Sequence, residues 1–322
     1  MGAVKNNYHD VPYHNYAHAG DVLYTVFRFM CLTGSRQWLT DVDQYALLVA
    51  AFCHDLGHFG KTNPFLVETR HEMALRYNDK SPLENMHCAK LFDITSNAET
   101  DIFKLTSKEN FKDARKTCIA AILHTDNVHH FDMIKELNKL YEMEESICEA
   151  QAPEVALTAR YKSDVLVRNK LKWMELFLHL ADVSNPLKPF EIGKQWAWRV
   201  LEEFFAQGDE EKELGLPIGM LNDRDKVNRP GSQHGFINFL VAPLITSTVK
   251  LFPMLEHLHR QMSANFTGWK DLWIETAKPS AEDIVIRDAE IQKNKDVSEQ
   301  LFQRTRRIPS KRVSVRNITK TL

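Results

Sequence analysis

Long apolar-rich runs with helical patterning dominate the chain. The runs DVLYTVFRFMCL and DQYALLVAAFCHDLG end close to a Gly, and RNKLKWMELFLHLADVSN stops at Pro186. All three are too long for ordinary strands, and Gly and Pro are common just beyond helix ends. No convincing run alternates apolar and polar residues between Asn-Gly or Asp-Gly turns, as a hairpin would. The pattern therefore predicts an all-α fold, arranged as one compact multi-helix domain.

Two further segments extend this pattern. QWAWRVLEEFFAQGDEEKELG predicts a helix that ends near Gly208, and GFINFLVAPLITSTVKLFPMLEHLHRQM predicts a helix that Pro243 and Pro253 kink or divide. The polar segment NKLYEMEESICEAQAPEVA is expected to be a connection outside the core. The C-terminal stretch 304–322 carries seven Lys/Arg and no acid, which is typical of a solvated basic tail.

Composition narrows the class of protein. The 322 residues are 43% hydrophobic and 26% charged, as in a folded globular protein, and the formal net charge of −2 argues against nucleic acid as a partner. Five scattered cysteines without a Cys-x-x-Cys spacing indicate reduced thiols, and hence a cytoplasmic location. The sequence has no apolar run of 18 residues, so we expect no membrane span.

Histidines and aspartates gather at the ends of the apolar runs. His54 and Asp55 are adjacent, Asp182 follows another apolar helix, and His14 and His18 are four apart, which on a helix would stack both imidazoles on one face. Each of these residues also fits a plain role in packing or at the surface. Together, however, His18, His54, Asp55 and Asp182 supply two imidazoles and two carboxylates. Such ligands suit Zn²⁺ or a similar ion, and spare carboxylate capacity suits a second ion, Mg²⁺ or Mn²⁺.

Several motifs resemble the catalytic domain of the class I cyclic nucleotide phosphodiesterases, in that family's order and at similar spacings. They are YHNYAHAGD, HDLGHFGKTNPF, YNDKSPLENMH, LHTDN, ADVSNPLKP, EEFFAQGDEEKELGLP and SQHGFINFLVAPL. The resemblance implies a catalytic domain over residues 1–276, followed by a C-terminal helix and tail over 277–322. It also implies hydrolysis of 3′,5′-cyclic AMP or GMP to the 5′-monophosphate. Relatives carry several packing helices ahead of the position of His14, so N-terminal helices are expected to be missing and an apolar patch exposed.

The resemblance also assigns roles to matching residues. His14 would be the general acid, and Glu84 would hold it in its protonated orientation. The two divalent ions, Zn²⁺ and Mg²⁺ with Mn²⁺ as an alternative, would be held by His18, His54, Asp55 and Asp182, with Asp55 reaching both. The side chains expected to contact metal-bound waters are His58, Thr125 and Asp126.

The same resemblance indicates the substrate pocket. Gln233 would read the purine edge, and Phe236 would stack on the base from the same helix face. Val200 would close the opposite side, and Tyr13 would also contact the substrate. Asn185 matches an asparagine typical of members that accept cAMP, so we expect cAMP to be favoured and cGMP also to be accepted.

Two other functions stay open, namely a catalytically impaired cyclic-nucleotide-binding or scaffold protein and another His-Asp metal-dependent nucleotide phosphohydrolase. Partners beyond the substrate are a kinase acting on the tail and a second copy in a homodimer. Ser310 and Ser314 follow paired basic residues, as basophilic kinases prefer. A plain solvated terminus explains the same pattern.

Overall fold

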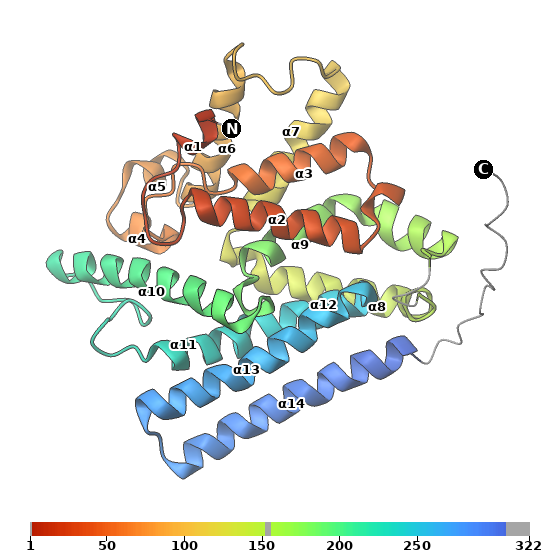
Figure 1. The fold of residues 1–322 in the computed structure, drawn as a ribbon. Helices are drawn as coiled ribbons and strands as arrows, with labels where there is room; N and C mark the ends of the chain where they lie inside the picture. The colour runs from red at the N-terminus through yellow and green to blue at the C-terminus, as the bar shows by residue number, and fades with distance from the viewer. Residues whose placement is uncertain (1, 152–155, 307–322) are drawn as a thin grey trace, which may run out of the picture.

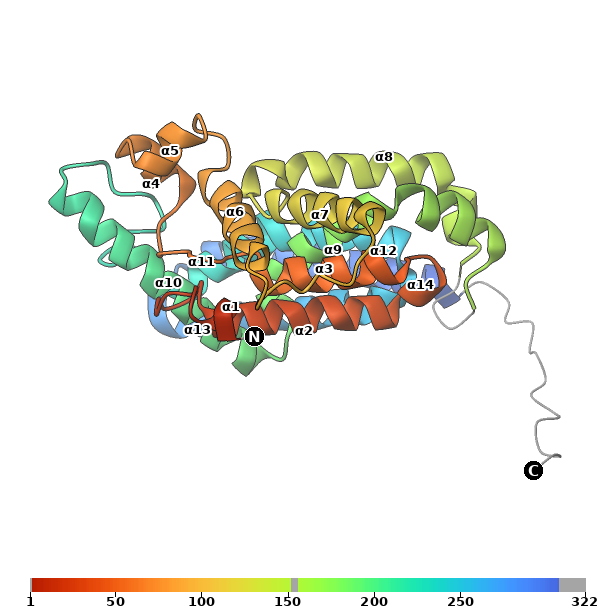
Figure 2. The same ribbon diagram turned by 90° about the horizontal axis from the view of Figure 1, so that it is seen from above.

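The computed structural model describes residues 2–151 and 156–306, and in these ranges every regular element is a helix. Figure 1 shows the helices packed around one another in a single body, and Figure 2 shows α9 enclosed by its neighbours. The α-helices are α1 (Gly2–Lys5), α2 (Tyr16–Leu32), α3 (Asp41–Cys53), α4 (Asn63–Glu68), α5 (Glu72–Arg76), α6 (Pro82–Ser96), α7 (Lys108–Leu123), α8 (His130–Glu149), α9 (Lys170–Asp182), α10 (Phe190–Glu213), α11 (Arg229–Phe236), α12 (Ala242–Leu251), α13 (Glu256–Ala277) and α14 (Ala281–Arg306). The predicted all-α fold is confirmed.

Local signals fix where the helices that carry the site begin. The side chain of Asn15 accepts hydrogen bonds from the backbone N–H groups of Ala17 and His18, which starts α2. Thr40 and Asp43 form a reciprocal capping box at the start of α3. Both arrangements satisfy backbone donors that have no partner inside the first helical turn.

The hydrophobic core surrounds α9. Trp173 and Phe177 on this helix are fully buried, and Phe177 packs edge-on against Phe29 of α2 and Phe252 after α12. Helices α2, α3 and α7 also pack against α9. Because α9 is held on several sides, its last residue, Asp182, has a fixed position relative to α2 and α3.

Two expectations about the fold were wrong. Helix α10 does not end near Gly208 but continues to Glu213. Gly208 instead allows the backbone of Asn222 to approach the helix, because a Cβ at this position would lie 2.0 Å from the carbonyl oxygen of Asn222. The segment expected to be a polar connection instead forms most of α8, which buries Tyr141, Ile147 and Cys148. The few apolar residues of this segment share one helix face. The overall composition is therefore polar, as in a loop, although the segment forms an amphipathic helix.

The C-terminal helix packs on the rest of the chain. Helices α13 and α14 are joined at 278–280, close to the expected boundary at 276, and Ile291 and Leu301 of α14 enter the main core. Tyr24 and Phe27, three positions apart in α2, are 61% and 48% exposed, so this helix carries two large apolar side chains on its outer face. Among residues 2–151 and 156–306, no helix combines the length and apolar character needed to cross a bilayer.

Candidate active site

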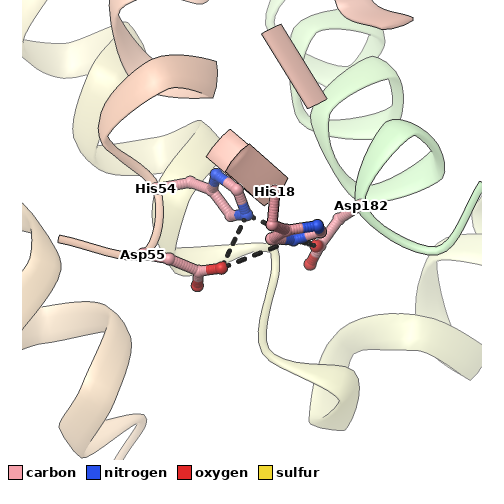
Figure 3. Close-up of side chains that lie close together, drawn as sticks. All are labelled: His18, His54, Asp55 and Asp182. Carbon is pink, nitrogen blue, oxygen red and sulfur yellow. Dashed lines mark hydrogen bonds and ion pairs between the residues drawn. The ribbon is translucent and has the colours of Figure 1, made fainter. Parts of the chain in front are cut away.

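Four side chains from three parts of the chain meet beside the core. His18 lies in the first turn of α2, His54 and Asp55 directly follow α3, and Asp182 is the last residue of α9. Figure 3 shows these four side chains pointing toward one another. We call them the metal cluster (His18, His54, Asp55 and Asp182), and all their candidate ligand atoms lie within 4.8 Å of one another.

The separations in the metal cluster suit one small cation. His18 Nε2 lies 3.0 Å from Asp182 Oδ1 and 3.5 Å from Asp55 Oδ2. His54 Nε2 lies 3.3 Å and 3.1 Å from the same two oxygens. A tetrahedral zinc site with bonds of about 2.0–2.1 Å places neighbouring ligand atoms roughly 3.3 Å apart. The four measured distances therefore lie on either side of the ligand-to-ligand distance expected for such a site.

The hydrogen bonding of His54 supports a cation at this position. The Nδ1 of His54 lies 2.9 Å from the carbonyl oxygen of Ala51, which assigns the proton to Nδ1 and leaves a lone pair on Nε2. Nε2 of His54 and Oδ2 of Asp55 are buried without a hydrogen-bond partner. Lone pairs that face one another in a buried site repel unless a positive charge lies between them. The residues therefore fit a divalent ion.

The electrostatics of the metal cluster point the same way. Burial alone would raise the pKa of Asp55, but the charges of His54 and His14 outweigh burial and hold that pKa well below its usual value. Burial lowers the pKa of His54, but Asp55 and Asp182 outweigh burial and raise the pKa well above its usual value, so either a second proton on His54 or a cation in place of that proton supplies the positive charge beside the carboxylates. The pKa of His18 is lowered by burial, which favours the neutral imidazole that a metal requires. A positive charge between the carboxylates of Asp55 and Asp182 would therefore be stabilised.

Several of the residues expected to contact metal-bound waters are buried, and His87 lies beside the other oxygen of Asp55. His87 Nε2 lies 3.8 Å from Asp55 Oδ1, and the ring of His58 stacks near that of His87, with centroids 5.7 Å apart. Asp126 is buried, and its Oδ2 accepts a hydrogen bond from Asn63 at 3.2 Å. Buried Thr125 donates its hydroxyl to the carbonyl oxygen of Ile122. Each carboxylate oxygen of Asp55 therefore has at least one imidazole nearby, His54 at Oδ2 and His87 at Oδ1.

His14 lies beside the metal cluster, with Glu203 of α10 behind it. Nδ1 of His14 forms a short hydrogen-bonded ion pair with Oε1 of Glu203, and the backbone N–H groups of Tyr13 and His14 donate to Oε2 at 2.9 and 3.1 Å. Burial lowers the pKa of His14, but the charges of Glu203, Asp55 and Asp182 together with the hydrogen bond to Glu203 outweigh burial and raise the pKa to about 9. His14 is therefore protonated at neutral pH, and no described residue hydrogen-bonds its Nε2.

Two expectations about His14 were wrong. His14 precedes α2 and is not helical, so its spacing from His18 does not arise from a helix face, although the two rings lie 5.8 Å apart. Glu84 does not hold His14. It accepts a hydrogen bond from Asn63 at 2.8 Å, and burial together with Asp126 raises its pKa to about 7. Asn63 thus bridges Glu84 and Asp126, and Glu203 occupies the place beside His14.

The residues expected to bind the purine lie on α10 and α11. Gln233 and Phe236 are three positions apart on α11, and Val200 lies on α10, which contacts α11. Gln233 is 6% exposed, and in the described ranges no hydrogen bond joins its side-chain amide to another residue. An amide without a protein partner is available to a ligand.

Asn185 and Tyr13 form a pair near the metal cluster. The Nδ2 of Asn185 donates to the hydroxyl oxygen of Tyr13 at 2.8 Å, and Oδ1 of Asn185 is buried without a partner. The ring of Tyr13 lies 4.4 Å from that of His18, which places the pair next to the metal cluster. The free oxygen of this amide is a hydrogen-bond acceptor.

Comparison with known proteins decides the family. The model of the 3′5′-cyclic nucleotide phosphodiesterase family matches residues 13–262, a range that contains His14, Glu203 and the metal cluster. The chain belongs to this phosphodiesterase family. The phosphodiesterase domain of a RhoPDE fusion protein from the choanoflagellate Salpingoeca rosetta has a similar structure, with a TM-score of 0.78 and 30% sequence identity over 86% of this chain and 83% of that one.

Curated relatives differ in the substrate that their names give. The mouse high affinity cGMP-specific 3′,5′-cyclic phosphodiesterase 9A is 35% identical over 254 residues, covering 79% of this chain and 44% of that protein. A Drosophila melanogaster dual specificity calcium/calmodulin-dependent 3′,5′-cyclic nucleotide phosphodiesterase 1 is 38% identical over 232 residues, covering 72% and 25%. The chain thus spans less than half the length of these phosphodiesterases.

Sequence reasoning missed Glu203 and its neighbours on α10. Glu203, Gln207 and Glu211 are spaced four apart and all are buried, so they form a polar stripe on an inward face of the helix. Gln207 donates to Glu211 at 2.7 Å and to Thr62 at 3.1 Å, which ties α10 to the loop ahead of α4. Polar residues at helical spacing among apolar ones were the available signal for this stripe.

Proposed function

We propose that this chain hydrolyses 3′,5′-cyclic nucleotides to nucleoside 5′-monophosphates, with His14 as the general acid. The observation that carries the proposal is an imidazole, His14, paired with buried Glu203 directly beside a cluster of metal-ligand type. Phosphodiester hydrolysis needs charge neutralisation at the phosphate and a proton for the departing oxygen. The two parts of the site would meet these two needs.

The roles follow from the contacts of each residue. The metal cluster would hold the first ion, Zn²⁺, and Asp55 would also reach Mg²⁺ or Mn²⁺. Bound ions of this kind activate water and neutralise phosphate charge. Nε2 of His14 would donate its proton to O3′ as the P–O3′ bond breaks. Glu203 would hold the other nitrogen, which fixes the orientation of the ring and stabilises its charged form. His58, Thr125 and Asp126 would orient the surrounding waters.

Adenine is the purine that the Asn185 pair favours. The exocyclic amine of adenine is a donor, whereas guanine has an acceptor at the same position, and the free atom on Asn185 is an acceptor. Gln233 would bind the purine edge between Phe236 and Val200. Since no described side chain holds the amide of Gln233, it can turn to meet either purine. We therefore propose hydrolysis of both nucleotides, with cAMP preferred.

The test is product formation by the purified chain. We expect cAMP and cGMP to be converted to their 5′-monophosphates, with activity lost on chelation and restored by Zn²⁺ plus Mg²⁺. Binding of cyclic nucleotide without turnover would favour a scaffold protein. Release of inorganic phosphate from 5′-nucleotides, with no action on cyclic ones, would favour another His-Asp phosphohydrolase.

Several partner hypotheses rest on the sequence alone. Ser310 and Ser314 lie outside the described residues, and phosphorylation there by a basophilic kinase stays a hypothesis, as do homodimerisation and a cytoplasmic location. Mass mapping after incubation with cAMP-dependent kinase tests the first, and light scattering of the purified chain tests the second.

A further inference from the structure

Helix α14 lies beyond residue 262, the last residue that the family model matches. It runs alongside α13 on the outside of the molecule (Figure 1), and its residues make two kinds of contact. Some contacts reach only α13: Asp288 binds Lys270 at 2.6 Å, and Asn294 accepts from Ser263 at 2.5 Å. These contacts dock the helix but do not touch the purine side of the site.

Glu290 makes the second kind of contact. Its Oε1 accepts a hydrogen bond from Nδ2 of Asn238 at 3.0 Å, and its Oε2 lies 3.7 Å from Nδ1 of His234. His234 directly follows Gln233, and Asn238 follows Phe236 by two positions. One carboxylate on α14 therefore reaches both ends of the short segment that carries the two expected purine contacts.

The backbone after α11 changes its hydrogen-bond register at a π-helical turn. A π-helical turn, Ile237–Val241, follows α11 directly and contains Asn238. Single π turns inside α-helices are rare, and changing one to the α register would rotate the residues before it relative to those after it. Pro243, in the first turn of α12, supplies no N–H to continue an α register through this point. A side chain anchored on another helix would select one register.

The first turn of α11 also rests on a side chain that α14 supports. The guanidinium carbon of Arg287 lies 3.9 Å from the ring centroid of Trp273. A Cβ at Gly231 would lie 3.3 Å from Cδ1 of that indole, so Trp273 packs directly beneath α11. Arg287 and Glu290 are one turn apart on α14, and together they support both ends of α11 from behind.

We propose that Glu290 is a positioning residue for the purine-binding helix, and that it sets the affinity for cyclic nucleotide through Asn238 without acting in the chemical step. The inference rests on the proposed function, because Gln233 and Phe236 must contact the base. The phosphate end of the site, with His14 and the metal cluster, receives no contact from α14 among the described residues. Loss of the anchor would therefore change binding and spare turnover at saturation.

The experiment compares Glu290→Ala with a matched control on the same helix, Asp288→Ala. Glu290→Ala is expected to raise KM for cAMP and cGMP about tenfold, the effect of one hydrogen bond to a charged group, with kcat within about twofold of wild type. Asp288→Ala loses an exposed ion pair to α13 and is expected to keep both constants. Glu290→Gln keeps an acceptor oxygen for Asn238, so it is expected to restore most of the lost affinity.

Hydrogen–deuterium exchange gives a readout that does not need activity. Amides of residues 229–241 are expected to exchange faster in Glu290→Ala and to match wild type in Asp288→Ala. Equal effects of both variants on KM, a fall in kcat at unchanged KM, or unchanged exchange across 229–241 would each overturn the proposal. If the chain proves inactive on cyclic nucleotides, the proposed function fails, and the exchange result still decides whether Glu290 anchors α11.

Discussion

His14 and Glu203 are separated by 189 positions in the chain, and yet Nδ1 of His14 and Oε1 of Glu203 form a hydrogen-bonded ion pair. The pair joins the segment ahead of α2 to the middle of α10. Burial alone would raise the pKa of Glu203, but the charge of His14, its hydrogen bonds and the charge of His58 together outweigh burial and lower the pKa to about 2. Each partner therefore keeps the other charged across the neutral pH range.

This pairing predicts the alkaline limb of the pH–rate profile. The acid acts only when protonated, so kcat of the wild type is expected to hold below about pH 9 and to fall as pH rises through that value. Glu203→Gln removes the largest of the charges that raise the pKa of His14, while burial remains and only Asp55 and Asp182 still oppose it. The alkaline limb should therefore move to lower pH. Initial rates at saturating cAMP between pH 5 and 10 measure the shift.

The pair also links stability to pH. The folded pKa of His14 lies above its ordinary value of 6.5, so the stabilisation is fully present below pH 6.5 and is lost as pH rises through about 9. Urea unfolding at pH 6 and pH 10 is expected to show a smaller loss for Glu203→Gln than for the wild type. Identical losses, or an unmoved alkaline limb, would contradict the role of Glu203.

His14→Asn tests the proton donor itself. The amide keeps a similar shape but cannot supply the proton, so kcat is expected to fall about 10²- to 10⁴-fold. Bound metal should stay at the wild-type level, because His14 lies outside the metal cluster. Metal analysis beside the kinetics separates the two effects. A substrate whose leaving oxygen needs no proton should lose much less, and an equal loss on both substrates would reject the acid role.

Asp182→Asn is expected to empty the metal cluster. Asp182 Oδ1 lies within 3.3 Å of the Nε2 atoms of both His18 and His54, and an uncharged amide is a much weaker ligand than a carboxylate. We expect bound zinc to fall by about tenfold or more and activity to fall with it. Asp132→Asn, on the exposed side of α8, is the matched control. Full metal content and normal turnover in Asp182→Asn would refute the assignment.

The sequence predicted most helices because their apolar faces repeat at helical spacing. It could not give the approach of His18 to Asp182, which are 164 positions apart, from spacing alone. The resemblance to the phosphodiesterase family supplied that grouping. Glu203 was not predicted because Glu202 beside it carries the same carboxylate, and only the four-residue spacing of Glu203 from Gln207 and Glu211 distinguishes the two in the sequence. In the structure Glu202 is exposed and pairs with Arg229. Only the packing of α10 decides which one turns inward.

Gly208 illustrates the same limit for the backbone. A glycine is a good helix terminator in a sequence, but here it allows the 214–228 loop to contact α10 close to its C-terminal end. Gly208→Ala is expected to destabilise the fold by about 1–3 kcal/mol, because the backbone of Asn222 cannot move away cheaply. Gly20→Ala, in α2 with no atom within 4 Å of the added Cβ, should stabilise by up to about 1 kcal/mol. Urea unfolding measures the free energy of unfolding of both variants. Equal changes would show that the contact between residue 208 and Asn222 can relax without cost.

The last prediction concerns the choice of purine. The hydroxyl of Tyr13 accepts a hydrogen bond from Nδ2 of Asn185 and so fixes the orientation of the amide, whose Oδ1 has no partner; that acceptor suits the amine of adenine. Tyr13→Phe removes the hydroxyl, and the amide can then turn its Nδ2 toward the carbonyl of guanine. The ratio of kcat/KM for cGMP to that for cAMP is expected to rise about five- to tenfold, the effect of one hydrogen bond. Asn185→Ala removes donor and acceptor together, and it should lower kcat/KM for cAMP more than for cGMP. The ratio should be measured in both variants. A general loss of positioning would lower kcat/KM for the two nucleotides equally and leave their ratio unchanged. Unchanged ratios in both variants would remove the Tyr13–Asn185 pair from purine selection.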